Sequence, residues 1–300
     1  MSSAPRGAEM TSEVVARSRT PGKKCFDFSL PLGRIHPRMA EQGSRQSVDS
    51  TGSTEPCRAC GGSLERCFDS IVLGDVPVTY HRCVRCGSLM LPEPHWLDRS
   101  YSQVITPDPD FGALRRTLFV DRFLRRLRGA GIVKRACRTL DYGSGLGTLV
   151  RMQRDRDIEA WGYDLYATPK FADAYCGRQL PDGDFDLITC IEVLEHTKNP
   201  VEVLQVLRSR LKPKGVVVVS TEMVDDQPLL ETWPYLAREH GQHITLLSRA
   251  GFTTAVESVG FRWVTSFRHY RIPFLHLLVP KERASPRLRL LLLGLRQLAG

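Results

Sequence analysis

The sequence lacks any apolar run of about 18 residues, the length that a membrane-spanning helix requires, so no such helix is expected. Residues 1–24 contain no apolar stretch of the kind found in secretory signals, which indicates a cytoplasmic protein. Hydrophobic periodicity is also missing from residues 1–52, where serine, glycine, proline and charged residues dominate. Such a segment buries too little apolar surface to fold, so residues 1–52 are expected to be flexible.

Acidic residues are too few to balance the basic ones, since 42 Lys and Arg face 33 Asp and Glu. The formal charge of +9 is compatible with an anionic partner such as a nucleic acid, a nucleotide sugar or a membrane surface. An arginine-rich, solvated surface explains the charge equally well, because acids are interleaved almost throughout. The 300 residues, 42% of them hydrophobic, suffice for one large domain or a medium domain with a small appendage.

The sequence contains no internal repeats except two C-x2-C motifs, each followed by a glycine. Their cysteines are Cys57, Cys60, Cys83 and Cys86. Four thiolates in two such turns match a tetrahedral structural zinc site. Disulfides are the alternative, but they need an oxidising compartment and nothing in the sequence exports the chain. Zinc is therefore expected to fold a small module over residues 53–106, with no coordination position left for catalysis.

Helical and strand-like patterns alternate from residue 107 onward. An amphipathic helix is predicted first, with arginines on its other faces and these apolar positions at helical spacing: Leu114, Leu118, Phe119, Phe123 and Leu127. A strand, a glycine turn and a helix follow in 137–153, and further strands in 158–166, 185–196 and 216–220. Strands alternating with helices predict an α/β fold with a parallel, doubly wound sheet.

The best-marked helix is predicted over residues 199–215. Asn199 is expected to be its N-cap, Pro200 occupies the first helical position, and Gly215 is expected to end the helix. The β-branched run that follows, at 216–220, is typical of a strand that is buried on both faces.

Three glycines at alternate positions, Gly143, Gly145 and Gly147, follow the first of these strands, and Asp141 precedes them. Dinucleotide enzymes use a different spacing, G-x-G-x-x-G, and an acid at this point would repel a pyrophosphate. A ligand with a carboxylate and a cationic group suits the turn better, because backbone amides can meet one charge and the acid the other. Asp164, at the end of the next strand, is placed to accept hydrogen bonds from ribose hydroxyls. Together these features describe S-adenosylmethionine.

At these motifs the sequence resembles the Rossmann-like methyltransferases, whose sheet has seven strands. The likeness covers residues 110–279, including "FDLITCIEVLEHTKNP" and "LKPKGVVVVST", which are similar to the family's fourth-strand segment and the helix–turn–strand after it. It implies an S-adenosylmethionine-binding methyltransferase domain at residues 107–280. The cofactor-binding residues that the resemblance implies are Asp141, Gly143, Ser144, Gly145, Gly147, Asp164, Leu165 and Cys190.

The cysteine module ahead of this domain resembles the N-terminal zinc module of a subgroup that methylates nucleotide-linked sugars, including at carbon. His243 in "YLAREHGQHITLLS" matches the last histidine of a segment in that subgroup, whereas Gly241 and Gln242 depart from the histidine and acid before it. The resemblance implies methyl transfer to carbon or oxygen of a small-molecule acceptor, a sugar, a glycan or a related metabolite.

Transfer to oxygen or carbon also requires a group that removes the acceptor's proton. The catalytic candidates are His243, His196 and Glu192, and the motif match favours His243, since histidine is best suited to proton transfer near neutral pH. Other candidates near the expected pocket mouth are Glu195, Tyr235, Glu239 and His240. His196 and Glu192 close the strand predicted at 185–196. They are therefore expected beside the glycine turn, at the carboxyl ends of the parallel strands, where such sheets bind ligands.

Other readings stay open for parts of the chain. The basic charge and the zinc module fit a nucleic-acid methyltransferase, although "IEVLEH" stands where a base-flipping segment would be expected. The glycine turn taken alone also fits an NAD-dependent oxidoreductase. Residues 281–300 alternate leucine and arginine at helical spacing. This amphipathic tail is expected to contact an anionic membrane surface, cap a neighbouring subunit or dock on its own domain.

Overall fold

The computed structural model describes residues 55–104, 111–269 and 272–283, which belong to one compact unit spanning residues 49–300. The segment expected to be flexible lies outside the described residues. So does the tail beyond Arg283, for which membrane contact is expected. Within the described part of the chain, no helix combines the length and the apolar character of a bilayer-spanning segment.

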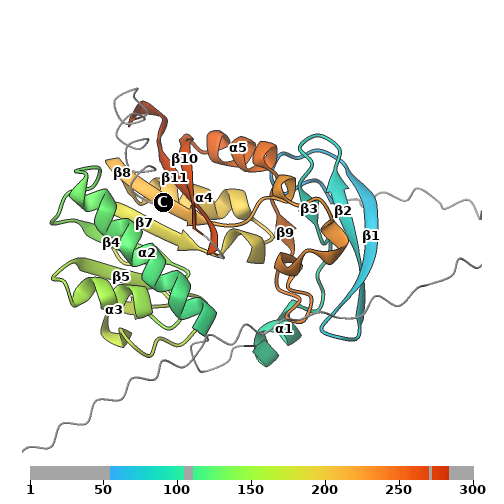
Figure 1. Cartoon of the computed structure of the whole chain (residues 1–300), viewed down its shortest axis with the longest axis horizontal. Coiled ribbons are helices and arrows are strands. Elements are labelled where there is room, and N and C mark those ends of the chain that lie inside the picture. The colour runs from blue at the N-terminus through green and yellow to red at the C-terminus, as the bar shows by residue number, and fades with distance from the viewer. Residues whose placement is uncertain (1–54, 105–110, 270–271, 284–300) are drawn as a thin grey trace, which may run out of the picture. The chain divides into compact units, whose positions relative to one another are not determined.

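A seven-stranded sheet is the centre of the fold (Figure 1). Its strands are β4 (Arg138–Tyr142), β5 (Glu159–Tyr163), β6 (Cys176–Gly177), β7 (Phe185–Ile191), β8 (Leu211–Ser220), β10 (Phe261–His269) and β11 (Ile272–Pro280). They lie in the order β10-β11-β8-β7-β4-β5-β6. Strands β4 to β8 run parallel, while β11 is antiparallel to both β8 and β10. The seven-stranded, doubly wound sheet expected from the sequence is confirmed.

The strand order reverses beside β4. The chain runs outward from β4 through β5 and β6, and then returns to the other side of β4 to form β7 and β8. A reversal of this kind separates the loops on either side and leaves room for a ligand at the carboxyl ends of the strands. Gly143, Asp164 and Glu192 directly follow the last residues of β4, β5 and β7, so the fold brings all three to this edge.

Helices cover both faces of the sheet. They are α2 (Phe111–Gly129) and α3 (Thr148–Arg154) on one face, and α4 (Pro200–Ser209) and α5 (Arg249–Ser258) on the other. Strand β8 supplies both cores, because successive side chains of a strand point to opposite faces. Val216 and Val218 pack with the α2 side, and Val217 and Val219 pack with the α4 side. The valine run is thus buried on both faces, as its composition predicts.

The predicted arginine-rich helix forms as α2, but the sequence pattern places its buried face too early. Its C-terminal half packs against the sheet through Val120, Phe123, Leu124 and Leu127. Leu114 and Leu118, expected on the same face, are 39% and 49% exposed. Leu114 borders a cavity beside the glycine turn instead of the sheet, and Leu118 is outside the core on that side.

Helix α4 is shorter than the predicted helix, since it ends at Ser209 and not at Gly215. Pro213 explains the difference, because proline cannot donate to the helical ladder and disfavours helical geometry in the residue before it. The stretch before Gly215 is the start of β8. Asn199 occupies the N-cap position, but its side chain accepts no capping hydrogen bond. Its own N–H donates to the hydroxyl of Thr197 at 3.0 Å.

A second sheet has four antiparallel strands, β1 (Leu64–Val72), β2 (Val76–Cys83), β3 (Leu89–Met90) and β9 (Thr245–Leu246). The first three lie in the region predicted to be a zinc module, but β9 comes from the chain beyond β8. Arg58 strengthens this junction by donating to the carbonyl oxygens of Ile244 and Leu91, both at 2.9 Å. The two regions therefore share a sheet, and their boundary at residue 106 stays a prediction.

The remaining short elements are α1 (Leu97–Val104) and the 3-10 helices η1 (Asp173–Tyr175), η2 (Leu194–His196), η3 (Val224–Asp226), η4 (Leu230–Thr232), η5 (Pro234–Leu236) and η6 (Lys281–Arg283). Most of them lie in connections at the carboxyl ends of the parallel strands. Loops at that edge carry the residues from which a site can be built.

The two halves of α2 predict different responses to the same substitution. Leu124→Ala, which empties a fully buried position, should lower the free energy of unfolding by about 2–5 kcal/mol. Leu118→Ala on the exposed half should change it by less than about 0.5 kcal/mol. Urea unfolding followed by circular dichroism measures both values. Equal losses in the two variants would contradict the described orientation of α2.

Candidate functional site

The glycine turn after β4 has a backbone that side chains disfavour. Gly143, Gly145 and Gly147 have φ angles of +80°, +53° and +79°, in the left-handed region where glycine carries no steric penalty. A Cβ atom at Gly143 would also lie 2.4 Å from a methyl group of Val193. A larger residue there would push into the start of the loop after β7. The turn therefore depends on glycine both for its conformation and for its space.

The amides of this turn bind protein acceptors, which differs from the expectation that they meet a ligand's negative charge. The N–H groups of Gly143 and Ser144 donate to the carbonyl oxygen of Tyr163, at 2.7 and 3.0 Å. The Gly145 N–H donates to the Asp164 carboxylate at 2.9 Å. The turn consequently offers a ligand close backbone approach, without a nest of free amides at these positions.

Asp164 is the acceptor that fixes two loops. Its Oδ2 receives the Gly145 N–H, and its Oδ1 receives the N–H groups of Tyr166 and Ala167 at 2.9 and 2.8 Å. A carboxylate has about four acceptor positions, so one remains for a hydroxyl donor. Asp164 is partly exposed and lines two of the cavities beside the turn.

Asp141 lies inside β4 and is only 5% exposed. Its Oδ1 accepts a hydrogen bond from the Thr189 hydroxyl at 2.7 Å. Burial raises the pKa of Asp141 to about 7; the Thr189 hydrogen bond opposes this rise and the nearby Asp164 charge adds to it. A cationic group beside Asp141 would favour its ionised form, as the sequence-based hypothesis requires.

Three cavities border the glycine turn. The smallest, about 110 Å³, is lined by Ser144, Gly145 and Asp164 together with Cys176 and Arg178. The other two share Gly143. The larger, about 760 Å³, is lined by Asp164 and Leu165 on one side and by Glu192 and His196 on another. Aromatic side chains form further walls: Tyr101, Tyr142, Tyr163 and Tyr166. The smaller, about 420 Å³, contains Asp141, Ser144 and Gly145 and is covered by Leu114 and Arg116 of α2. Residues from β4, β5 and β7 thus meet around one hollow.

Two residues expected to bind a cofactor lie elsewhere. Cys190 is fully buried in the core of β7 and lines none of these cavities, so its side chain does not face the candidate site. Gly147 also lines none of them. A Cβ there would lie 3.2 Å from Cys176 Sγ and 3.3 Å from Ala172 Cβ, so this glycine serves close packing at the start of α3.

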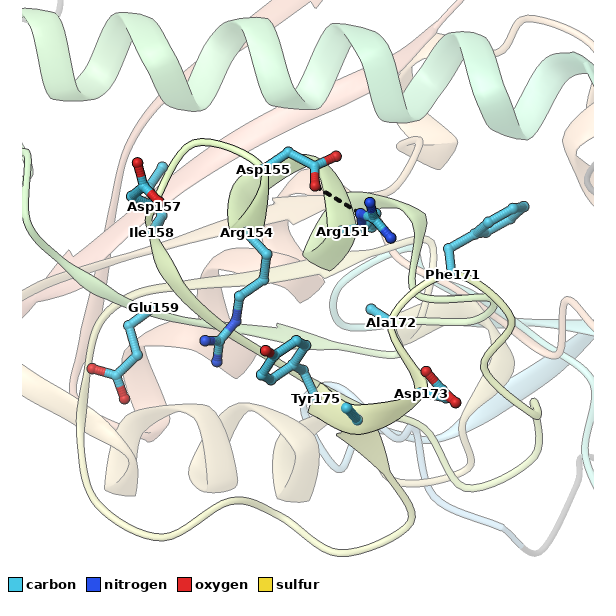
Figure 2. Close-up of a pocket in the computed structure, with 11 residues that line it drawn as sticks. Arg151, Arg154, Asp155, Asp157, Ile158, Glu159, Phe171, Ala172, Asp173 and Tyr175 are labelled. Carbon is cyan, nitrogen blue, oxygen red and sulfur yellow. Dashed lines mark hydrogen bonds and ion pairs between the residues drawn. The ribbon is translucent and has the colours of Figure 1, made fainter.

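A further hollow, of about 600 Å³, lies at the outer edge of the sheet beyond α3 and contains none of the predicted site residues. Figure 2 shows the side chains that line it, among them Arg151 and Asp155, which form an ion pair at 2.7 Å. The Arg154 guanidinium lies over the Tyr175 ring, 3.8 Å from its centre. This hollow contains neither the glycine turn nor Asp164, so it is not the candidate site.

Four side chains beyond β7 form what we call the Glu/His cluster, namely Glu192, Glu195, His196 and His243. Glu192 has a φ angle of +54°, an unusual value for a residue with a side chain and typical of functional positions. Its carboxylate accepts from the Ser220 hydroxyl and lies 4.0 Å from Arg116. Burial raises the pKa of Glu192, and the Arg116 charge opposes that rise.

The two histidines of the cluster are not equivalent. Their rings are perpendicular with centres 4.7 Å apart, and of the two only His196 lines the larger cavity. Burial lowers the pKa of His196 to about 3 and that of His243 to about 4, so both are neutral at pH 7. His243, which the motif match favours as the base, does not line that cavity, and the choice between the two histidines stays a prediction. No role for Tyr101 of α1 or Arg116 of α2 was predicted from the sequence, because these two helices contain no recognisable motif.

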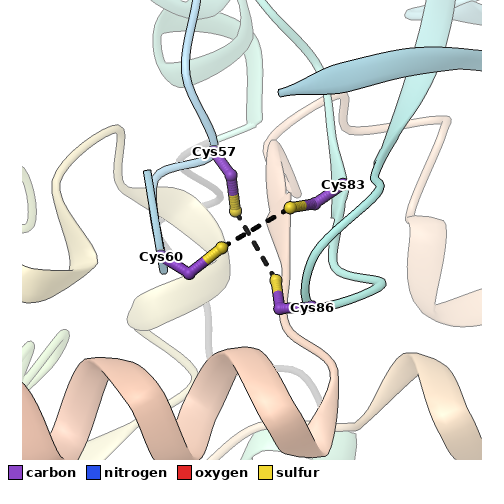
Figure 3. Close-up of side chains that lie close together, drawn as sticks. All are labelled: Cys57, Cys60, Cys83 and Cys86. Carbon is purple, nitrogen blue, oxygen red and sulfur yellow. Dashed lines mark hydrogen bonds between the residues drawn. The ribbon is translucent and has the colours of Figure 1, made fainter. Parts of the chain in front are cut away.

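The four cysteines of the N-terminal module also converge (Figure 3). Cys57 Sγ and Cys86 Sγ are 3.7 Å apart, and Cys60 Sγ and Cys83 Sγ are 3.5 Å apart. These distances are far longer than a disulfide bond, about 2.05 Å. They are close to the edge of a ZnS₄ tetrahedron, about 3.8 Å for Zn–S bonds of about 2.3 Å. The residues present therefore fit a tetrahedral metal ion.

The strand order, the glycine turn after β4 and the acid after β5 together define a Rossmann-like methyltransferase fold. A family model described as "Methyltransferase domain" matches residues 113–266, more than half of the chain. The protein therefore belongs to this methyltransferase domain family. That match ends within β10, so it includes α2, the glycine turn and the Glu/His cluster and excludes the four cysteines.

Curated relatives match a shorter stretch. The chain is 32% identical over 102 residues to the ubiquinone biosynthesis O-methyltransferase of Dechloromonas aromatica, which covers 28% of this chain and 44% of that protein. A mitochondrial ubiquinone biosynthesis O-methyltransferase of Schizosaccharomyces pombe is 49% identical over 45 residues, covering 15% and 16%. The chain thus spans less than half the length of these curated relatives.

Solved structures with a similar fold include the magnesium protoporphyrin IX methyltransferase of Synechocystis with bound S-adenosylhomocysteine. Its TM-score is 0.44 at 14% identity, over 62% of this chain and 96% of that one. The mitomycin 7-O-methyltransferase has a TM-score of 0.41 at 18% identity, over 60% of each chain.

The buried Asp141 predicts a stability that depends on pH. Because its folded pKa lies above its unfolded value, the unfolded chain ionises first as the pH rises from about 4 to about 7, and stability falls over that range. Asp141→Asn keeps an acceptor for Thr189 and removes this loss. In protein prepared without cofactor, the variant should be more stable than the wild type at pH 8, by roughly 4 kcal/mol at about 1.4 kcal/mol per pKa unit.

Urea unfolding of both proteins at pH 4 and pH 8 checks this. The advantage of the Asn variant should shrink toward pH 4, where the carboxyl group is protonated in the fold and only partly ionised in the unfolded chain. A difference of the same size at both pH values would show that Asp141 is ionised in the fold without penalty.

Proposed function

We propose that the protein is an S-adenosylmethionine-dependent methyltransferase that acts on a hydroxyl group of a small molecule. The observation that carries this proposal is the larger cavity, whose walls combine Gly143 and Asp164 with Glu192 and His196. One wall suits the cofactor and the other suits an acceptor that must lose a proton. Membership of the methyltransferase domain family and the O-methyltransferase names of the curated relatives support it.

The residues around the turn fit the cofactor. Gly143 keeps open a space that a Cβ would fill, and Asp164 retains acceptor capacity for a ribose hydroxyl. Leu165 lies on the same wall, and Asp141 in the smaller cavity would favour a cationic amino group. Ser144 and Gly145 line that smaller cavity too. When bound, S-adenosylmethionine supplies a methyl group attached to a sulfonium sulfur, and that sulfur is a good leaving group.

The protein's own contribution is then alignment and proton removal. Glu192 and His196 face the cavity that would hold the acceptor, and His243 supports His196 from behind. The four tyrosines on the cavity walls favour a flat, partly apolar acceptor, since aromatic faces stack on rings. We therefore place phenolic hydroxyls first among acceptors, with sugar hydroxyls as the second class to test.

The alternative NAD-dependent function is less compatible with the turn. A pyrophosphate needs free amides, but those of Gly143 and Ser144 donate to Tyr163 and that of Gly145 donates to Asp164. Buried Asp141 adds an acid behind the same turn. These contacts oppose an anionic cofactor and are compatible with one that carries a positive charge.

We further propose that Cys57, Cys60, Cys83 and Cys86 bind a structural zinc ion. The module is joined to α5 through serine hydroxyls: the Ser248 side chain donates to the Cys86 carbonyl oxygen, and the Ser248 N–H donates to Ser88 Oγ at 3.0 Å. Ser248 also caps α5 by accepting from the Gly251 N–H. A metal that fixes Cys86 would thereby fix the segment that follows His243.

Cofactor binding gives the first test of this function. The purified protein should bind S-adenosylhomocysteine, and Asp164→Ala should weaken binding by about ten- to a hundredfold, because a charge-assisted hydrogen bond contributes about 1.5–3 kcal/mol. Isothermal titration calorimetry measures the affinity. Transfer of a labelled methyl group to panels of phenols and sugars then identifies the acceptor class.

Asp173→Ala is the matched control, since Asp173 is an exposed acid that lines only the hollow beyond α3. It should bind like the wild type. Melting temperatures of both variants report any loosening of the loops that Asp164 fixes. Unchanged affinity in a folded Asp164→Ala variant would remove Asp164 from the cofactor site.

Metal analysis tests the zinc proposal. Protein expressed with zinc should carry one tightly held ion per chain, and Cys57→Ser should lose it and become more sensitive to proteolysis in the N-terminal module. The seven-stranded sheet should still form, because it has a separate core on the α2 side. Cys67→Ser, which changes an exposed cysteine outside the cluster, should keep the metal. Recovery of metal-free wild type would refute the proposal.

A further inference from the structure

Buried polar atoms in the Glu/His cluster lack partners. Glu195 is fully buried, and neither its Oε2 nor Nδ1 of His196 receives a hydrogen bond of normal geometry within the described residues. Most buried polar groups in proteins are paired, so two such atoms on neighbouring residues need an explanation. Ligand-capable atoms of Glu195, His196 and His243 all lie within 4.8 Å of one another. One ligand-capable atom from each of these three residues therefore lies in a single small space.

The hydrogen bonds around this space orient the side chains of His243 and Glu195 so that each keeps a lone pair free to bind a ligand. Nδ1 of His243 faces the carbonyl oxygen of Tyr235, which can only accept, so Nδ1 carries the proton and Nε2 keeps its lone pair. The Tyr235 hydroxyl donates to Oε1 of Glu195, which leaves Oε2. Metal-binding histidines and carboxylates are commonly oriented by outer hydrogen bonds of this kind.

The charge of the Glu/His cluster also favours a bound cation. Glu192 and Glu195 are two acidic side chains close to each other and removed from water. Arg116 forms an ion pair with Glu192 at 4.0 Å, whereas no ion pair with Glu195 is found among the described residues. A buried carboxyl group stays ionised only where a cation or a metal lies beside it, and otherwise becomes neutral. A divalent cation would balance the negative charge that Arg116 alone does not neutralise.

We propose that Glu195, His196 and His243 bind one divalent transition-metal cation at the edge of the larger cavity. Two imidazoles and one carboxylate suit first-row ions such as Zn²⁺, Mn²⁺ or Co²⁺, and three protein ligands leave positions open. His196 lines the cavity, so an acceptor oxygen there can reach the ion. This site differs from the four-cysteine cluster, where sulfur fills every position of a tetrahedron.

The chemical role of the cation rests on the proposed function, because it requires a hydroxyl acceptor. A cation held by these three residues would supply positive charge beside the acceptor hydroxyl, which would favour loss of its proton near neutral pH. Glu192, which lines the same cavity and is not among the three ligands, receives the proton. The oxygen then forms a bond to the methyl carbon as the bond from that carbon to sulfur breaks. No oxidant or reductant is needed.

Titration of the metal alone tests the site without any methyl transfer. Full-length protein that keeps its cysteine-bound zinc is titrated with Co²⁺ by calorimetry and visible absorbance. We expect one further binding event per chain, with weak d–d bands and without the strong thiolate charge-transfer band. Glu195→Gln and His243→Ala should each weaken it at least tenfold. Tyr235→Phe, which removes the outer hydrogen bond to Glu195, should weaken it about ten- to a hundredfold.

Matched controls are available nearby in the chain. Glu239→Gln and His240→Ala change an exposed acid and an exposed histidine and should leave Co²⁺ affinity unchanged. Thermal unfolding confirms that each cluster variant is folded, and Glu195→Gln removes a buried charge without changing side-chain size. The absence of a second Co²⁺ event in the wild type, or an equal event in folded Glu195→Gln and His243→Ala, overturns the proposal.

The outcomes also separate this inference from the proposed function. Protein that binds S-adenosylhomocysteine but no second cation remains a methyltransferase candidate without this metal site. Protein that binds the cation but not S-adenosylhomocysteine keeps the metal site and loses the proposed function. The cluster variants should bind S-adenosylhomocysteine like the wild type, because their residues lie outside the cofactor wall.

Discussion

The Asp164 carboxylate joins two loops on which the rest of the site depends. Through the N–H groups of Gly145, Tyr166 and Ala167 it links the turn after β4 to the loop after β5. The Tyr163 carbonyl oxygen, one residue earlier, holds two more amides of the turn. A backbone with positive φ angles is thus fixed by its neighbouring strand and not by a ligand. A wall fixed in this way is organised before anything binds.

The opposite wall of the cavity is assembled from distant parts of the chain. Glu192 and His196 follow β7 directly, but His243 and Tyr235 come from the long connection between β8 and β9. That connection is held by the N-terminal module through Arg58, Ser88 and the pairing of β3 with β9. The two candidate metal centres are therefore linked mechanically while differing in chemistry, since one has four sulfur ligands and the other has nitrogen and oxygen.

Local patterns predicted the parts of the fold that local forces determine. The valine run of β8 and the acid–glycine motif after β4 gave the parallel sheet and the edge where a site forms, because burial and steric limits act on a few neighbouring residues. The exposed Leu118 and the early end of α4 follow from where the sheet ends and from Pro213. Periodicity alone did not resolve either feature.

The positions of the glycine turn and Asp164 could be predicted from local motifs, whereas the arrangement of the Glu/His cluster could not. Gly143, Asp164 and Leu165 lie where the motifs place them, whereas Cys190 is buried in the core and Gly147 is used for packing. The ordering of His196 in front of His243 depends on a contact between segments separated by all of α4 and β8. No spacing within one segment contains that information.

Strand β9 carries a consequence for how this chain is made. β3 leaves the ribosome early, but its partner β9 follows only after β4 to β8 have been synthesised. Contacts between such distant segments form slowly, because the intervening chain must be ordered first. During translation the edge of β3 in the N-terminal module therefore stays unpaired until β9 is made. Exposed strand edges favour aggregation. An ion bound early by Cys57, Cys60, Cys83 and Cys86 would keep the nascent module folded through that interval.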